Sequence, residues 1–485
     1  MARVVVLGGG VSGHTAAAFL KRWLGKQHQV TVVTPNSQWN WIPSNIWVGV
    51  GKMKRESVLF DLAPVYQKVG IDYQQAKALS IHPEGDSSDS GAFVEVEYTG
   101  QGKIGERARL PYDYLVNATG PKLKFEATEG LGPGGFSESV CTADHAAHSA
   151  AQMRRLIDEM KQGQRKTFVI GTGHGTCTCQ GAAFEYLFNI DYVLREQKVR
   201  DQAELVWLTN EYELGDFGMG GAHIKEGGFI TNTKIFTESL MAERGIKWIT
   251  RAHVQRVTET EIFFEKLDGS SGSIAYDFTM LIPPFSGVGL KAYDKSGADI
   301  TDKVFAPNGF MRVDADYSGK PYEQWSAEDW PKTYQSPSYP NMFACGIAFA
   351  PPHAISKPMK SPNGTPISPT PPRTGMPSAM IGKSVARNIV AMIKGKAKSP
   401  EHTSSMARIG AACVASTGSS IVKGSAVSMT VFPIVPDYQK YPKYGRDLSL
   451  TFGEIGLAGH WIKYILHRMF LYKAKLKPFW YLIPE

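Results

Sequence analysis

The chain carries short apolar runs that end in glycine, and such runs predict buried parallel strands. Arg3–Leu7 and Gln29–Thr34 are the first two. Between them, His14–Leu24 has apolar residues three and four positions apart, which predicts a helix packed on the strands. A strand, a glycine turn, a helix and a second strand within about 30 residues predict the first unit of a doubly wound α/β domain.

The turn after the first strand contains three spaced glycines, Gly8-x-Gly10-x-x-Gly13. Residues without a Cβ let the backbone approach a pyrophosphate, and the free N–H groups of a helix N-terminus favour an anion. The turn therefore predicts a bound dinucleotide, with Ser12 as a further contact. The second strand ends at Thr34 instead of the usual Asp or Glu, so we expect Thr34 or Asn36 at the ribose.

Two later runs also end in glycine and resemble further signatures of flavoproteins with two dinucleotide-binding domains. Leu115–Pro121 contains Thr119 and Gly120, and Asn341–Gly346 resembles the strand that returns to the flavin domain late in such chains. NAD alone would not explain the second and third signatures. Three signatures in this order imply FAD as the cofactor.

A second nucleotide-type turn lies in Thr167–Thr176, where glycine occupies positions 171, 173 and 175 but Thr176 takes the sixth position. Cys177-Thr-Cys179 follows, where a nicotinamide nucleotide would need room. Both features argue against NAD(P)H at this turn. The helix start that we expect just before Cys177 and Cys179 would lower the pKa of these thiols.

The length and composition predict a folded protein of several domains. The chain has 485 residues, 42% of them hydrophobic and 20% charged, which excludes a disordered chain. The net charge of +8 without a basic block favours an anionic membrane surface over nucleic acid. We predict an α/β fold of two Rossmann-like domains: a FAD-binding domain formed by residues 1–165 and 339–400, a second domain with redox cysteines at 166–338, and a quinone- and membrane-associating region at 401–485.

The last part of the chain predicts an amphipathic helix. At helical spacing, an apolar arc gathers Trp461, Ile465, Met469, Tyr472 and Leu476, with Ile462, Leu466 and Phe470 beside them. Lys463, His467, Arg468, Lys473 and Lys477 fall largely elsewhere. We expect a peripheral, monotopic helix in the membrane interface, without a signal peptide or a spanning helix. The alternative is a terminal helix docked on the protein's own core or on a partner subunit, for example in a homo-oligomer.

Five cysteines, at positions 141, 177, 179, 345 and 413, point to redox chemistry. An odd number argues against a disulfide framework, and the spacing does not fit a structural zinc site. Thiols beside a flavin transfer electrons or sulfur. We therefore expect no metal centre.

With these cysteines, the chain resembles the sulfide:quinone oxidoreductase family almost from end to end. The similar segments are Pro43–Gly51, Ser139–His145, Cys179–Glu185 and the stretch Pro372-Arg-Thr-Gly-Met. The resemblance implies an enzyme that oxidises sulfide to cysteine-bound sulfur or polysulfide and passes the electrons through FAD to a membrane quinone. It also implies a monotopic position on a membrane.

The resemblance also implies roles for individual residues. Cys179 would be the flavin-side sulfur and Cys141 a second thiol nearer the surface, with His145 and Glu185 handling protons. Ser44 and Thr374 lie in the segments near the flavin, Gly346 ends the returning strand, and Phe349 would line the quinone site.

Two positions depart from the family pattern. Ala348 stands at the family's third cysteine, so either Cys177 or Cys345 takes its place in the sulfur-bridging pair. Asp216 stands where another family histidine is expected. An NAD(P)H:quinone dehydrogenase of the same fold, or a flavin-bearing sulfur carrier or persulfide sensor without quinone turnover, is the alternative function.

Overall fold

The computed structural model describes residues 1–418 and 424–485 and contains two sheets with parallel strands at their centres. The first sheet has the order β21-β8-β1-β2-β5-β6-β7, with β20 paired to β5. Its strands β21, β8, β1, β2 and β5 are parallel, and β6 and β7 are antiparallel to their neighbours. Their bounds are β1 (Arg3–Leu7), β2 (Gln29–Thr34), β5 (Asp72–His82), β6 (Phe93–Tyr98), β7 (Arg107–Pro111), β8 (Tyr114–Asn117), β20 (Lys291–Ala292) and β21 (Met342–Ala344).

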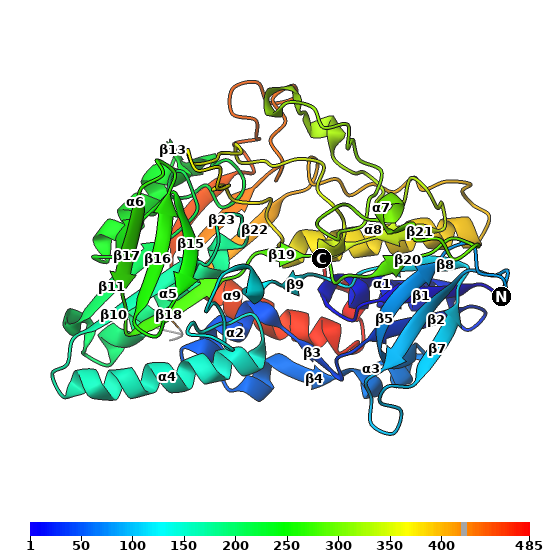
Figure 1. Cartoon of the computed structure of the whole chain (residues 1–485), viewed down its shortest axis with the longest axis horizontal. Helices are drawn as coiled ribbons and strands as arrows, with labels where there is room; N and C mark the ends of the chain where they lie inside the picture. Colours follow the sequence, from blue (N-terminus) through cyan, green and yellow to red (C-terminus); the bar gives the residue numbers. More distant parts are fainter. Residues whose placement is uncertain (419–423) are drawn as a thin grey trace.

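The second sheet has the order β14-β11-β10-β18, and all its strands are parallel. Figure 1 shows the two sheets toward opposite ends of the long axis. Together they confirm the predicted α/β fold with two Rossmann-like units. The bounds are β10 (Lys166–Thr172), β11 (Ala203–Leu208), β14 (Lys247–Ile249) and β18 (Phe278–Ile282).

Helices pack beside both sheets. Helix α1 (Val11–Leu24) packs closely against α8 (Gly375–Ile393) beside the first sheet, and α5 (Gln180–Glu196) packs on β10 and β11. Helix α1 begins three residues earlier than the apolar pattern predicts, because Ser12 and Gly13 in its first turn hide the periodicity. The remaining helices here are α2 (Asn45–Gly49), α3 (Leu62–Val69), α4 (Ala143–Lys161), α6 (Thr233–Glu243) and α7 (Thr301–Val304).

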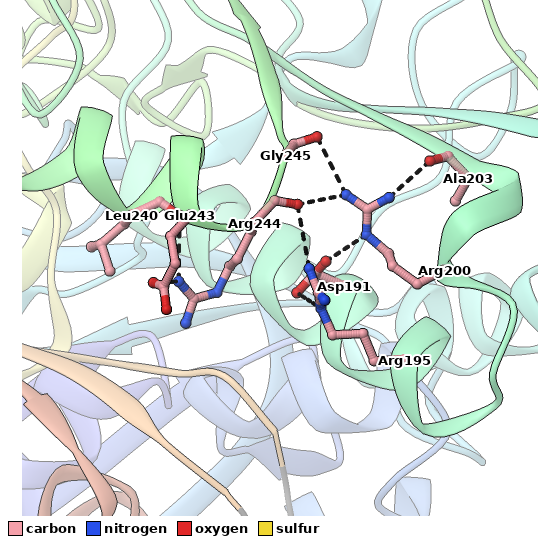
Figure 2. Close-up of polar contacts among 8 residues, drawn as sticks. All are labelled: Asp191, Arg195, Arg200, Ala203, Leu240, Glu243, Arg244 and Gly245. Atoms are coloured by element: carbon pink, nitrogen blue, oxygen red, sulfur yellow. Dashed lines mark hydrogen bonds and ion pairs between the residues drawn. The ribbon is translucent and has the colours of Figure 1, made fainter.

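The C-terminal end of α5 is fixed by a buried carboxylate. Asp191 accepts hydrogen bonds from Arg195 Nε at 2.9 Å and from Arg200 Nε at 2.6 Å. Arg200 also donates to the carbonyl groups of Ala203 and Arg244, so it joins the helix to β11 and to the end of α6 (Figure 2). These contacts fix the direction of the helix that follows Cys179.

A five-stranded sheet, in the order β13-β12-β24-β23-β22, joins the second unit to the C-terminal region. Its strands are β12 (His223–Glu226), β13 (Phe229–Asn232), β22 (Ala411–Ser416), β23 (Ala426–Val431) and β24 (Phe452–Gly456). The smaller pairings involve β3 (Gln38–Asn40), β4 (Leu59–Asp61), β9 (Lys122–Leu123), β15 (Ala252–Val257), β16 (Glu261–Lys266), β17 (Ser271–Ala275) and β19 (Phe285–Ser286). Helix α9 (Leu457–Ala474) follows β24 and packs on β22 and β23.

Helix α9 turns part of its cationic side toward the protein. Lys463 and His467 are 7% and 3% exposed, whereas Ile462 and Ile465 are 49% and 59% exposed. An amphipathic helix in the membrane interface would turn its apolar arc to the membrane and its cationic residues to water. This expectation is wrong for three of the cationic residues, Lys463, His467 and Lys473, which are buried. In the described part of the chain, no helix has the length and apolar character needed to cross a membrane.

Candidate active site

The first glycine turn is shaped so that side chains are excluded from it. Gly8 has φ of 106°, and a Cβ there would lie 2.1 Å from the carbonyl oxygen of Ala118. A Cβ on Gly13 would lie 2.0 Å from the Gly8 oxygen, whereas a Cβ on Gly10 would enter open space. Helix α1 begins here without a side-chain cap, so its first N–H groups face this space. The turn fits the pyrophosphate of FAD.

A substitution at Gly8 tests this geometry. We expect Gly8→Ala to lower both the thermal stability and the FAD content, because the new Cβ meets the Ala118 backbone in a left-handed conformation that costs about 1–2 kcal/mol by itself. Gly10→Ala should reduce FAD content without lowering the melting temperature of the FAD-free protein. Flavin absorbance and thermal unfolding measure both effects, with Gly134→Ala, whose Cβ meets nothing, as control. Unchanged FAD binding in Gly10→Ala would place the cofactor elsewhere.

The fold brings distant flavin-site residues to this turn. The Ser12 hydroxyl donates to the Ser378 carbonyl of α8 at 2.8 Å, and a Cβ on Gly346 would lie 2.6 Å from Ser12 Cβ. Cys345 also contacts Ser12, which partly offsets the burial that raises the pKa of this thiol to about 12. Residues 12, 345, 346 and 378 therefore meet where β1 and β21 end.

The other predicted flavin contacts line neighbouring loops. Thr34 is buried beside Gly9, and the Thr119 hydroxyl donates to Asn117 Oδ1 at 2.8 Å. Gly120 has φ of 70° with open space at its Cβ position, and Thr374 is the N-cap residue of α8. Ser44 is buried and its hydroxyl pairs with His467 Nδ1 at 2.8 Å. Their contacts with FAD stay predictions.

Cys179 holds a strained position at the start of α5. It is the N-cap residue with φ of 65°, a left-handed conformation that side chains rarely adopt. Its thiol points toward the Arg373 carbonyl, with Sγ and O 3.7 Å apart. Burial raises the pKa of this thiol to about 11. The expected lowering of the pKa is therefore wrong for the protein alone, and the helix begins after Cys179 instead of before Cys177.

Three thiols gather at this point. Burial raises the pKa of Cys177 and Cys179, and electrostatic repulsion from Cys141 raises it further. This interaction indicates that the three thiols are neighbours. Cys177 is fully buried and donates to the Ile282 carbonyl at 2.9 Å, while Cys141 and Cys179 are partly exposed. Cys345 lies instead at Ser12, as described above. Cys413 of β22 lies beside Gly181 in the first turn of α5.

His145 reaches the Cys141 backbone through a serine that the sequence reasoning did not single out. Ser139 Oγ accepts a hydrogen bond from the Cys141 N–H at 3.2 Å and pairs with His145 Nδ1 at 3.3 Å. Burial lowers the pKa of His145, so its imidazole is neutral at pH 7. The sequence contains a signal for Ser139, since this residue begins the segment Ser139–His145 that resembles the family.

Glu185 forms a buried ion pair with Lys463 of α9. The same carboxylate oxygen accepts from the Ser416 N–H at 3.0 Å and from its hydroxyl at 2.6 Å. Neither Lys463 nor Ser416 was assigned a site role from the sequence. Asp216 likewise has a local partner, since its carboxylate contacts the Ser356 hydroxyl and accepts from the Gly218 N–H at 2.9 Å.

A partly buried arginine lies next to the Cys179 thiol. Arg373 donates to the carbonyl oxygens of Ile347 and Phe349, both at 3.1 Å, and its guanidinium lies 5.3 Å from the centre of the Phe349 ring. Burial lowers the pKa of Arg373 to about 10, and no carboxylate pairs with it within residues 1–418 and 424–485. A partly buried cation of this kind fits a flavin ring, which gains negative charge on reduction.

The proline-rich segment Ala350–Pro372 covers the second glycine turn. A Cβ on Gly175 would lie 2.1 Å from the Pro366 carbonyl oxygen, and Ser368 N–H donates to the Gly175 carbonyl at 2.8 Å. The Gly175 N–H, of the kind that would bind a pyrophosphate, donates to His253 Nδ1 at 2.9 Å. The segment and His253 thus occupy the approach that NAD(P)H would need.

Known proteins resemble this chain over most of its length. A family model described as "Pyridine nucleotide-disulphide oxidoreductase" matches residues 2–203. The sulfide-quinone reductase of Aquifex aeolicus is 29% identical over 472 residues, covering 97% of this chain and 91% of its own. The mitochondrial sulfide:quinone oxidoreductase of Mus musculus is 24% identical and covers 71% of this chain and 64% of its own.

The fold comparison agrees with the sequence comparison. The crystal structure of the sulfide:quinone oxidoreductase from Aquifex aeolicus superposes with a TM-score of 0.76 at 28% identity, covering 98% of this chain and 92% of that one. The match includes both Rossmann-like units and the C-terminal region, since so little of either chain is left out. The chain is therefore similar along nearly its whole length to sulfide:quinone oxidoreductases, and it has the fold of flavoproteins with two dinucleotide-binding domains.

Proposed function

We propose that this protein is an FAD-dependent sulfide:quinone oxidoreductase, which oxidises sulfide to cysteine-bound sulfur and passes the electrons to a membrane quinone. The observation that carries the proposal is the position of Cys179, strained at the start of α5 beside Cys141 and the Arg373 segment. Similarity to sulfide:quinone oxidoreductases along nearly the whole chain supports the same activity.

The cofactor site would be formed by residues from three parts of the chain. They are Gly8, Gly10, Ser12, Gly13, Thr34 and Ser44 from the first part of the chain, Thr119 and Gly120 after β8, and Gly346 and Thr374 near α8. Bound FAD would supply the two-electron redox chemistry between sulfur and quinone. The domain boundaries at residues 165, 338 and 400 stay predictions.

The thiols provide the sulfur chemistry. Cys179 and Cys141 would hold the sulfur, and Cys177 is a neighbour that hydrogen-bonds to a backbone carbonyl. Because His145 is neutral at pH 7 and reaches Ser139, it is placed to accept the proton that Cys141 releases. Burial raises the pKa of both thiols, so they are protonated at pH 7 in the protein alone.

Phe349 and the exposed side of α9 would provide the quinone and membrane contacts. Phe349 is 2% exposed and packs edge-on against Tyr334, with ring centres 5.0 Å apart, so it would form a wall of the quinone site behind Arg373. The exposed residues of α9, Ile462 and Ile465, would enter the lipid surface. Quinone would then arrive from the membrane without passing through water.

An anaerobic titration tests the proposed function. Sulfide should bleach the flavin absorbance of the purified protein, and a soluble quinone should restore it. NADH should not bleach the flavin absorbance under the same conditions, because the segment from Pro366 to Thr370 covers the second glycine turn. A flavin that sulfide leaves oxidised would exclude the activity, and bleaching by NADH would favour the dehydrogenase. Persulfidated cysteine without quinone turnover would indicate a sulfur carrier.

A further inference from the structure

Helix α9 buries a polar side against the rest of the protein. His460, Lys463 and His467 recur at three- and four-residue spacing and are all buried, and two of them, Lys463 and His467, have polar partners outside the helix. On the other side of the helix, Ile462 and Ile465 are largely exposed. Apolar contacts also hold α9, such as the stacking of Phe470 on Trp41 with ring centres 5.1 Å apart. The buried charge of Lys463 needs a specific polar partner in addition.

A buried ion pair joins α9 to α5. Lys463 Nζ pairs with Glu185, and it also donates to the Val414 carbonyl of β22 at 2.9 Å. Both side chains of the ion pair are 9% exposed. Two opposite charges removed from water at the same point stabilise each other only while both are present.

The ion pair belongs to a junction between three elements. Ser416 of β22 donates twice to the Glu185 carboxylate, and Asn189, one turn later on α5, donates to the Ser416 carbonyl at 2.6 Å. Helix α5 is thus fixed at its middle by this junction and at its far end by the Asp191 contacts of Figure 2. Its near end begins at Cys179.

The same face of α9 also meets α2 and its N-cap residue, Ser44. His467 Nδ1 pairs with Ser44 Oγ at 2.8 Å, and the Trp47 ring lies 5.8 Å from Lys463 Nζ. Ser44 is one of the residues that we place at the flavin. Lys463 therefore lies between the helix that follows the sulfur-binding cysteine and the segment beside the cofactor.

We propose that Lys463 is a positioning residue, which acts through Glu185 to fix the membrane-facing helix α9 against the cysteine-bearing helix α5. This inference rests on the proposed function and deepens it, because α9 would set the quinone entrance relative to the redox site. It assigns Glu185 to this ion pair in place of the proton-handling role expected from the sequence. The pair makes quinone access, and not sulfide oxidation, depend on Lys463.

Three variants of the full-length FAD-loaded protein separate these roles. Lys463→Met leaves the Glu185 charge buried alone, Glu185→Met leaves Lys463 alone, and the double variant removes both charges with similar volume. Lys477→Met is the matched control, since Lys477 is exposed on the segment after the same helix. Each variant is measured in detergent by amide hydrogen exchange of residues 457–474 and by rapid kinetics.

We expect exchange in α9 to accelerate at least about tenfold in either single variant and to return toward the wild-type rate in the double variant. In Lys463→Met, the KM for a soluble quinone should rise at least about fivefold while flavin reduction by sulfide stays within about twofold. Lys477→Met should change neither quantity.

Three results would overturn the inference. Wild-type exchange in Lys463→Met would mean that the ion pair does not hold α9, and equal slowing of sulfide-driven reduction and quinone turnover would indicate a general structural defect. A Glu185→Met variant that loses sulfide-driven reduction with unchanged exchange would return Glu185 to proton transfer. The exchange measurement does not depend on activity, so it remains decisive if wild-type flavin proves insensitive to sulfide and the proposed function fails.

Discussion

Cys179→Ala should reduce the rate of sulfide-driven flavin reduction by at least about 1,000-fold while FAD stays bound, because the variant lacks the sulfur that accepts the substrate. The fold should survive, since Ala and Cys carry the same Cβ strain at φ of 65° and the lost Sγ contact to the Arg373 carbonyl is long, at 3.7 Å. Stopped-flow absorbance after anaerobic mixing with sulfide measures the rate, and the flavin spectrum and thermal unfolding measure the rest.

The other cysteines provide the comparison for this variant. Cys413→Ala should keep the wild-type rate, because its thiol lies at Gly181 on the outer side of α5. Cys177→Ala and Cys345→Ala decide which thiol completes the sulfur-bridging pair, and the contact of Cys345 with Ser12 favours Cys177. A Cys179→Ala protein that sulfide still bleaches at the normal rate would move the sulfur chemistry to another thiol.

The parts of the fold that depend on local patterns were predictable from the sequence. Glycine turns between apolar strands need only neighbours in the chain, so β1, β2 and the turn from Gly8 to Gly13 follow directly from residue type and spacing. Segments such as Asn341–Gly346 were predictable as strands from their resemblance to flavoproteins. Their pairing beside β8 depends on contacts between residues more than 200 positions apart.

The orientation of α9 was not predictable from its sequence. Helical spacing separates apolar from charged residues, but it does not say which side faces the protein. The choice depends on partners elsewhere in the chain, namely Glu185 for Lys463 and Ser44 for His467. A helix can bury its charged side only where such partners exist, and no local pattern records them.

The electrostatics of the candidate site also depend on the whole fold. The sequence places cysteines near a helix start, which alone lowers a thiol pKa. In the folded chain, burial outweighs this effect and raises the pKa of Cys179 to about 11. Arg373 was equally hidden, since its charge matters only because the fold surrounds it with carbonyl groups and rings.

Substitutions on the exposed side of α9 should have the second large effect, which is loss of membrane binding. We expect the double variant Ile462→Glu/Ile465→Glu to bind anionic lipid vesicles at least about 100-fold more weakly than the wild type. Burial of each isoleucine contributes about 1.5 kcal/mol or more, and each new carboxylate is repelled by about 1 kcal/mol from an anionic surface, which together exceed the 2.7 kcal/mol that a 100-fold change requires. Vesicle co-sedimentation at constant salt measures the change.

The folded protein itself should tolerate this double variant. Both side chains are about half exposed or more, so melting temperature, FAD content and reduction by sulfide should match the wild type, as in the control Ile104→Glu on the exposed loop between β6 and β7. If the double variant instead sediments with vesicles normally, lipid does not cover this side of α9. A partner subunit would then be the remaining cover, and analytical ultracentrifugation would detect the variant as a smaller particle. Weak vesicle binding with an unchanged particle mass leaves the lipid surface as the partner of α9.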